Sequence, residues 1–125
     1  MNRIIILITI LFIALNIHAQ ENKKKNLNIV FIGNSITQGV IIRNPKSNGP
    51  PVKACTYLRN QPWIGEVKFS NQGVSGHTTV DFLPQTRTSF LKVKAAADTF
   101  KDDNNAQLIF SIMLGSNDSA IEGPY

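Results

Sequence analysis

Two short runs of consecutive apolar residues limit the fold of this chain more than any other feature. Residues 29–32 read Ile-Val-Phe-Ile and end at Gly33, and residues 108–114 are nearly all apolar and end at Gly115. A β-branched run without polar alternation is typical of a strand that is buried on both faces. Such strands occur in parallel sheets covered by helices, so the sequence predicts an α/β fold.

The segments between these runs alternate between helical and extended patterns. Residues 43–51 contain three prolines and a glycine and predict a loop, and residues 54–60 are compatible with a short helix. Residues 66–70 alternate in polarity and predict a second strand, which ends at Asn71-Gln72-Gly73. Further along, apolar residues recur at helical spacing and predict a second helix with one buried face: Phe90, Val93, Ala97 and Phe100.

Each predicted strand ends in a polar cluster that contains glycine. These clusters are Gly33–Gly39, Asn71–His77 and Gly115–Asp118. The carboxyl ends of parallel strands lie along one edge of an open sheet, where α/β folds place their binding sites. We therefore expect three segments that are distant in sequence to meet at this edge.

The three clusters contain the groups that acyl transfer requires. Ser35 offers a hydroxyl group, Gly73 a backbone N–H that a ligand can approach, and Asn117 a carboxamide donor. A serine surrounded by such donors can attack an acyl group while the donors stabilise the oxyanion. Each cluster also has a structural interpretation: Asn34 and Ser35 favour a helix N-cap, the second cluster is compatible with a flexible turn, and the third with an Asx turn.

Three sequence blocks resemble those of the SGNH (GDSL-type) hydrolases. They are Val30-Phe31-Ile32-Gly33-Asn34-Ser35-Ile36-Thr37, Asn71-Gln72-Gly73-Val74-Ser75-Gly76 and Gly115-Ser116-Asn117-Asp118. The resemblance implies a flavodoxin-like three-layer α/β/α sandwich with a parallel sheet. It also implies a nucleophile at Ser35 and an oxyanion hole formed by the N–H groups of Ser35 and Gly73 with the side chain of Asn117. Asn34 and Asp118 take supporting positions in the first and third blocks.

The function expected from this resemblance is that of an exported serine esterase. Its substrates would be acetyl or other short-chain acyl esters, on carbohydrates, cleaved through an acyl-enzyme intermediate. One alternative is a lipid acyl hydrolase or thioesterase of the same family. The other is a glycan-binding module or inactive fragment that lacks the catalytic base.

The chain departs from the family pattern in two places. Asn34 stands where the first block usually has Asp, which removes a negative charge beside the nucleophile. The Asp-x-x-His that supplies the base is not found in the sequence, so we interpret residues 27–125 as the N-terminal part of a hydrolase domain whose C-terminal part is absent. Because the base is missing, we expect this chain alone to be inactive in ester hydrolysis. His77 lies four residues after Gly73, and we expect it to be a surface or substrate-contacting residue, not the base.

The N-terminus predicts export. Residues 1–19 combine Arg3, an apolar run from Ile4 to Leu15 and a small residue at Ala19, which is typical of a secretory signal peptide. The run is shorter than the roughly 20 residues that a membrane-spanning helix needs, so we expect no stable membrane anchor and a periplasmic or secreted protein. Residues 20–26, which contain three consecutive lysines, are interpreted as a polar tether.

Charge and side-chain composition exclude several classes of partner. The chain carries a formal net charge of +5. From residue 26 onward, however, it contains nine Lys and Arg residues and seven Asp and Glu residues, a balance of only +2. A nearly neutral folded domain does not favour binding to the negatively charged backbone of nucleic acids. The sequence also predicts no metal and no cofactor. The single cysteine, Cys55, cannot form an intramolecular disulfide, and we interpret it as a buried structural thiol.

Overall fold

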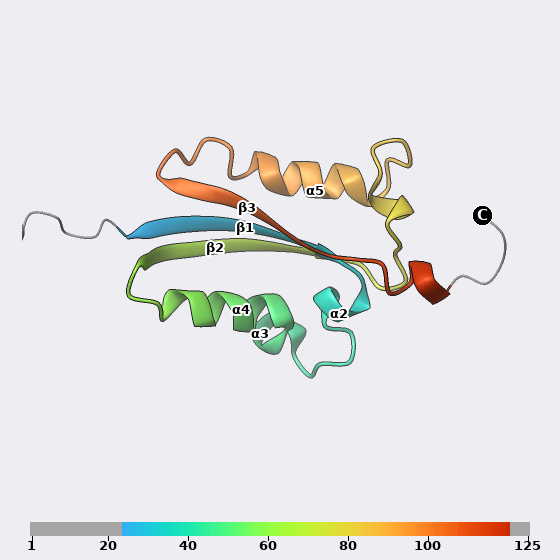
Figure 1. Cartoon of the computed structure of the whole chain (residues 1–125), viewed down its shortest axis with the longest axis horizontal. Helices are drawn as coiled ribbons and strands as arrows, with labels where there is room; N and C mark the ends of the chain where they lie inside the picture. Colours follow the sequence, from blue (N-terminus) through green and yellow to red (C-terminus); the bar gives the residue numbers. More distant parts are fainter. Residues whose placement is uncertain (1–23, 121–125) are drawn as a thin grey trace, which may run out of the picture.

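A computed structural model describes residues 24–120 of the chain. A parallel three-stranded sheet in the order β2-β1-β3 forms the middle layer. It comprises β1 (Lys25–Gly33), β2 (Ile64–Gly73) and β3 (Ala106–Met113). Helix α5 (Ser89–Asp98) covers one face, while α4 (Pro50–Arg59) lies on the other (Figure 1). The predicted α/β class with a parallel sheet is confirmed, and the architecture is compatible with a flavodoxin-like fold.

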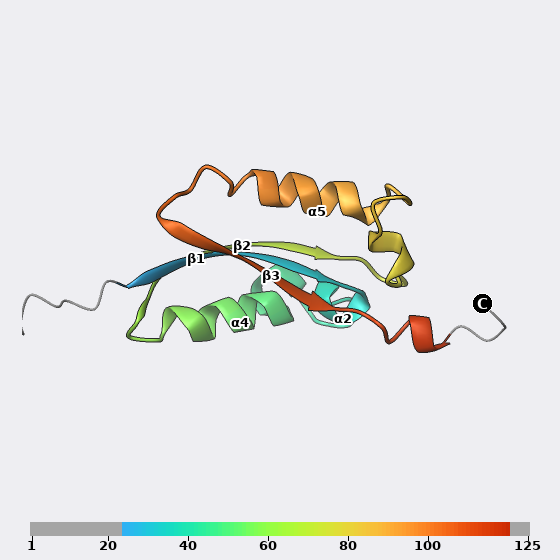
Figure 2. The ribbon, with the colours of Figure 1, turned by 45° about the horizontal axis from the view of Figure 1, so that its top comes forward.

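Four short segments complete the described chain. They are α2 (Ser35–Gln38), α3 (Pro45–Asn48) and the 3-10 helices η1 (Val80–Phe82) and η2 (Asp118–Ala120). Figure 2 shows η1 on the α5 side of the sheet and α2 on the α4 side, both near the ends of the strands. The carboxyl ends of the strands are therefore surrounded by loops and short helices.

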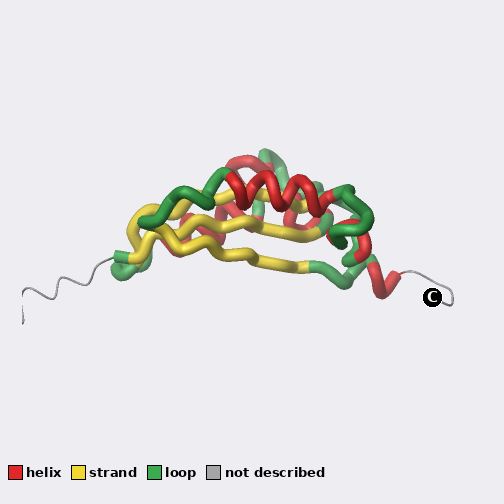
Figure 3. Tube along the Cα trace, turned by 90° about the horizontal axis from the view of Figure 1, so that it is seen from above, coloured by secondary structure: helices red, strands yellow, loops and turns green. Residues whose placement is uncertain are grey.

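The central strand β1 supplies side chains to a core on each face of the sheet. Leu27 and Ile29 pack with Cys55 of α4, whereas Val30 and Ile32 pack with Val93 of α5. Val30 is completely buried. The apolar run at residues 29–32 is therefore buried on both faces of the sheet, as the sequence predicts, because helices cover both sides of β1. Figure 3 shows α5 in front of the sheet, with its axis running along the strands, when the sheet is seen from above.

Several boundaries differ from the predicted ones. Lys25 and Asn26, assigned to the polar tether, belong to β1, where Lys25 N–H donates to Trp63 O at 3.0 Å. The predicted loop at 43–51 contains α3 and the start of α4, because prolines are compatible with the first turn of a helix. The predicted signal peptide, residues 1–19, lies outside the described residues.

The two edge strands of the sheet differ in their charge and exposure. β2 carries Glu66 and Lys68, whereas β3 contains no charged residue. Within residues 24–120, β3 pairs only with β1. Phe110 is 47% exposed and Ile112 is 66% exposed, although the sequence of β3 resembles that of a strand buried on both faces. The helices of the described chain cover β1 but leave these side chains in contact with solvent.

A polar cluster connects the amino-terminal half of the sheet to the loop before β3. The buried Asn28 donates from Nδ2 to Asp103 Oδ2 at 3.1 Å, and Lys68 Nζ lies 3.1 Å from the same oxygen. The hydrogen bond from Asn28, followed by that from Lys68, lowers the pKa of Asp103 below its usual value. The carboxylate form of Asp103 is therefore favoured in the folded protein.

We expect Asp103→Asn to remove an acid-sensitive part of the stability. A lowered folded pKa stabilises the protein above the unfolded pKa, near 4 for Asp, and this contribution is lost as the pH falls through the folded pKa. The variant should be less stable than the wild type at pH 7, and the difference should shrink as the pH falls below about 4. Urea unfolding between pH 2 and 7 measures this, with Asp102→Asn as the neighbouring control. Parallel pH curves for the wild type and Asp103→Asn would contradict the expectation.

Candidate active site

The carboxyl ends of all three strands meet at one level of the sheet. Gly33, the last residue of β1, is in register with Gly73 of β2 on one side and with Met113 of β3 on the other. Just beyond this level, Val74 N–H donates to Gly33 O at 2.9 Å. The predicted convergence of the three polar clusters at one sheet edge is therefore confirmed.

Ser35 is the first residue of α2, immediately after the end of β1. Its side chain is half-buried, and neither its Oγ nor its N–H has a hydrogen-bond partner within residues 24–120. Its carbonyl oxygen accepts the N–H groups of Gly39 at 2.9 Å and Val40 at 3.2 Å, which closes the short helix. The backbone of Ser35 is thus fixed, while its hydroxyl and N–H are available to a ligand.

Asn34 caps this helix and also connects it to the third cluster. Its Oδ1 accepts the N–H of Ile36 at 3.1 Å, and its Nδ2 donates to Ser116 Oγ at 2.5 Å. The side chain is 1% exposed. The N-cap suggested by the sequence is therefore formed by Asn34, which leaves Ser35 at the first helical position. The contact with Ser116 could not be recognised from the sequence, because serine and asparagine in turns are equally compatible with local hydrogen bonds.

We expect Asn34→Ala to destabilise the protein by about 1–2 kcal/mol, since loss of an N-cap side chain has this effect. Asn34→Asp should retain most of the stability, because a carboxylate can accept both the Ile36 N–H and a hydroxyl proton from Ser116. Urea unfolding at pH 7 compares the two variants with the wild type. Equal stability of Asn34→Ala and the wild type would show that the cap contributes nothing.

The second cluster is held against α2 by side-chain amides. Asn71 Nδ2 donates to Thr37 O at 3.0 Å, and Ser75 N–H donates to Gln38 Oε1 at 2.7 Å. The backbone of Gly73 lies so close to α2 that a Cβ atom there would be 2.5 Å from Gln38 N and 2.8 Å from Thr37 C. Glycine is required at this position because no side chain fits between the strand end and the helix. The positioning roles of Asn71 and Gln38 were not predicted.

The predicted oxyanion donor of Gly73 has an intramolecular partner. Its N–H donates to Asn71 Oδ1 at 2.9 Å, in the Asx-turn geometry that an asparagine two residues earlier allows. The Asn-x-Gly pattern is compatible with this turn. The sequence does not reveal that Asn71 Oδ1 occupies the N–H that a ligand oxygen would accept. A substrate oxygen could share this N–H or take the place of Asn71 Oδ1.

The third cluster is connected to the loop that follows β2. Asn117 Nδ2 donates to His77 O at 2.8 Å, which leaves its second amide hydrogen for another acceptor. The Asp118 carboxylate accepts the N–H of Thr79 at 3.0 Å and the Thr79 hydroxyl. These hydrogen bonds lower the pKa of Asp118. Asn117 and Asp118 therefore position the loop at residues 77–79 in addition to any role toward a ligand.

His77 is attached to the start of α5. Its Nδ1 lies 2.8 Å from the hydroxyl of Ser89, which is 1% exposed, and its ring packs edge-on against Phe82 with centroids 5.8 Å apart. His77 is half-buried, so part of it remains in contact with solvent. Its hydrogen bond anchors the loop after β2 to a buried serine.

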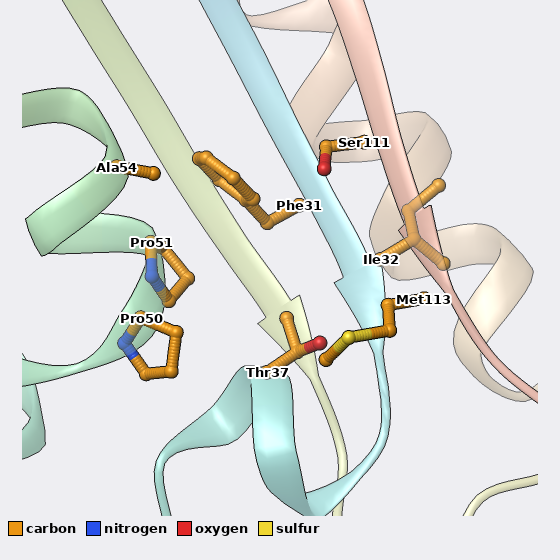
Figure 4. Close-up of a pocket in the computed structure, with 8 residues that line it drawn as sticks. All are labelled: Phe31, Ile32, Thr37, Pro50, Pro51, Ala54, Ser111 and Met113. Carbon is orange, nitrogen blue, oxygen red and sulfur yellow. The ribbon is translucent and has the colours of Figure 1, made fainter. Parts of the chain in front are cut away.

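A hollow of about 390 Å³ adjoins Ser35. Its other lining residues are all apolar: Ile36, Val40, Ile41, Ile42 and Pro50. A second, smaller hollow of about 160 Å³ lies between α4 and the ends of β1 and β3 (Figure 4). Phe31 faces Pro51 and Ala54 there, and Thr37 lies beside Met113, but Ser35 does not line it. The larger hollow is therefore the one next to the predicted nucleophile.

The remaining features of the described chain do not add to the site. Among residues 24–120 there is no group of three or more His, Cys, Asp or Glu side chains that could hold a metal ion. No helix in this part of the chain is long and apolar enough to cross a membrane. Cys55 is completely buried between α4 and the sheet, and its burial raises its pKa. A buried thiol with a raised pKa is a poor nucleophile, which agrees with its interpretation as structural.

A scan against protein-family models and a search of curated proteins give no match to this chain.

Proposed function

We propose that this chain belongs to a serine esterase of the SGNH type, with a flavodoxin-like fold and Ser35 as the nucleophile. The observation that carries the proposal is the position of Ser35. Its hydroxyl and N–H, which have no hydrogen-bond partner within residues 24–120, lie where three strand ends meet. Hydrogen bonds connect this segment to both other clusters. The sequence blocks that resemble the family supply the reaction class.

In the proposed reaction, Ser35 Oγ attacks the carbonyl carbon of an ester and the oxyanion is stabilised by nearby donors. The N–H of Ser35 is available, and Asn117 has one amide hydrogen beyond the bond to His77 O. The N–H of Gly73 would serve once it is shared with or released by Asn71 Oδ1. Each correctly placed donor contributes roughly 3–4 kcal/mol to stabilisation of the transition state.

The proton of Ser35 requires a general base. His77 is the single histidine in residues 24–120, and the family pattern that the sequence blocks resemble does not place a base at this position. We therefore assign the base to an Asp-x-x-His segment, which the resemblance implies and residues 24–120 do not contain. The alcohol then leaves, and water hydrolyses the acyl-enzyme. The proposed substrates are short-chain acyl esters of carbohydrates, and the proposed location is periplasmic or secreted.

Acylation by p-nitrophenyl acetate tests the nucleophile. The purified chain is incubated at pH 9, where hydroxide substitutes for a base, and the release of p-nitrophenolate is followed. We expect one equivalent per chain, with an acetyl group located by peptide mass spectrometry on Ser35. Acetylation confined to lysines or to other serines would contradict the proposal.

A further inference from the structure

The hollow beside Ser35 is built by a tight turn that folds residues 40–42 back toward the serine. Gly39 ends α2 with a φ of 80°, and Ile42 N–H donates to Gly39 O at 3.0 Å. A Cβ atom on Gly39 would lie 3.1 Å from Pro45 and 3.6 Å from Pro50, so the turn also packs against the start of the following helices. The position of the turn relative to Ser35 is thus determined by the backbone.

The turn presents apolar side chains to solvent next to the nucleophile. Ile41 is 97% exposed and Val40 is 54% exposed, while Ile36 on the first turn of α2 is 55% exposed. None of the described residues that line the hollow is charged. Exposed aliphatic side chains grouped beside a candidate nucleophile indicate a surface that becomes buried when an apolar ligand binds.

We propose that this hollow binds the acyl chain of the substrate and that the preferred acyl group is longer than acetyl. This inference rests on the proposed function, because it assumes that Ser35 is acylated. In an ester of a carbohydrate, the acyl chain is the apolar part. Sugar hydroxyl groups placed against Ile36, Val40 and Ile41 would lose their hydrogen bonds to water without finding new partners.

The volume of the hollow also argues against acetyl as the preferred group. A methyl group is similar in size to a water molecule, whose share of liquid volume is about 30 Å³. It would therefore fill less than a tenth of the hollow of about 390 Å³. A chain of several methylenes would instead cover the exposed isoleucines, and each buried methylene should strengthen binding by up to about fourfold.

A series of p-nitrophenyl esters tests the inference on the purified chain. Acetate, butyrate, hexanoate and octanoate are compared by the second-order rate of Ser35 acylation, after correction for the hydroxide-catalysed rate of each ester. In each acylation the bond between Oγ and the acyl carbon forms, the bond to p-nitrophenolate breaks, and the serine proton passes to solvent. We expect hexanoate to acylate Ser35 at least about tenfold faster than acetate, consistent with partial burial of its additional methylenes.

Ile41→Asp should lower the ratio of the hexanoate rate to the acetate rate by about tenfold, and because this side chain is almost fully exposed the substitution should affect folding little. Tyr57→Asp introduces the same charge at an exposed position of α4 and should have no effect. Equal corrected rates for all esters, or equal effects of the two variants, would overturn the inference while acetylation of Ser35 still supports the proposed function. Absence of any adduct on Ser35 would instead overturn the proposed function, and the inference with it.

Discussion

Ser35→Ala is expected to abolish the stoichiometric release of p-nitrophenolate and the adduct on residues 34–38. The hydroxyl is the group that becomes covalently modified, so its removal leaves no acceptor at the meeting point of the strand ends. The remaining release should be slower than in the wild type, because it reflects only the uncatalysed reaction and acylation of lysines. Stability should change little, since Ser35 Oγ forms no hydrogen bond within the described part of the chain.

Ser75→Ala is the matched control for this experiment. Ser75 lies at the same edge of the sheet, in the loop after β2, and its backbone N–H instead of its side chain is bonded to Gln38. The variant should acylate like the wild type. If the stoichiometric release of p-nitrophenolate survived in Ser35→Ala, or disappeared in Ser75→Ala, Ser35 could not be assigned as the nucleophile.

Gly73→Ala is expected to damage both the fold and the site. The added methyl group would lie 2.5 Å from Gln38 N and 2.8 Å from Thr37 C, which are backbone atoms and cannot move without displacing α2. Overpacking of this kind costs about 1–3 kcal/mol. Because Ser35 begins the displaced helix, we also expect a large loss of Ser35 acylation, of tenfold or more, in line with the sensitivity of catalysis to small misplacements.

Gly76→Ala separates these two effects. Gly76 has a φ of 80° with open space around its Cβ position, so the substitution introduces backbone strain without a collision. A left-handed conformation costs a non-glycine residue roughly 1–2 kcal/mol. Urea unfolding should show similar losses of stability for the two variants, whereas mass spectrometry should show reduced acylation for Gly73→Ala alone. If Gly76→Ala lost acylation equally, the effect would follow from stability and not from the displacement of α2.

The layer arrangement could be predicted because it depends on long-range burial that leaves a pattern in the sequence. The run at 29–32 is apolar without alternation because α4 and α5 cover the two faces of β1. The element boundaries were less predictable. The polar residues Lys25 and Asn26 join β1 because backbone hydrogen bonding extends beyond the covered core, and Pro50 begins α4 because the first turn of a helix needs no N–H from it.

The location of the candidate site was predictable for the same topological reason, whereas its internal hydrogen bonds were not. That Ser35, Gly73 and Asn117 lie at strand ends follows from the parallel sheet. The engagement of Gly73 by Asn71, and of Asn117 by the carbonyl of His77, depends on side-chain rotamers and loop geometry. Asn, Gln and Ser side chains have many alternative backbone partners, so the sequence alone does not identify which are used.

The unequal edges of the sheet determine where it can be extended. A strand added beside β2 would approach Glu66 and Lys68, whose charges oppose continuous pairing, whereas β3 offers an uncharged backbone flanked by Phe110, Ile112 and Met113. An added strand would therefore pair more readily with β3 than with β2. Met113 is in register with Gly33. If a further strand paired in parallel with β3, the residues after its carboxyl end would therefore lie at the edge of the sheet where Ser35 is.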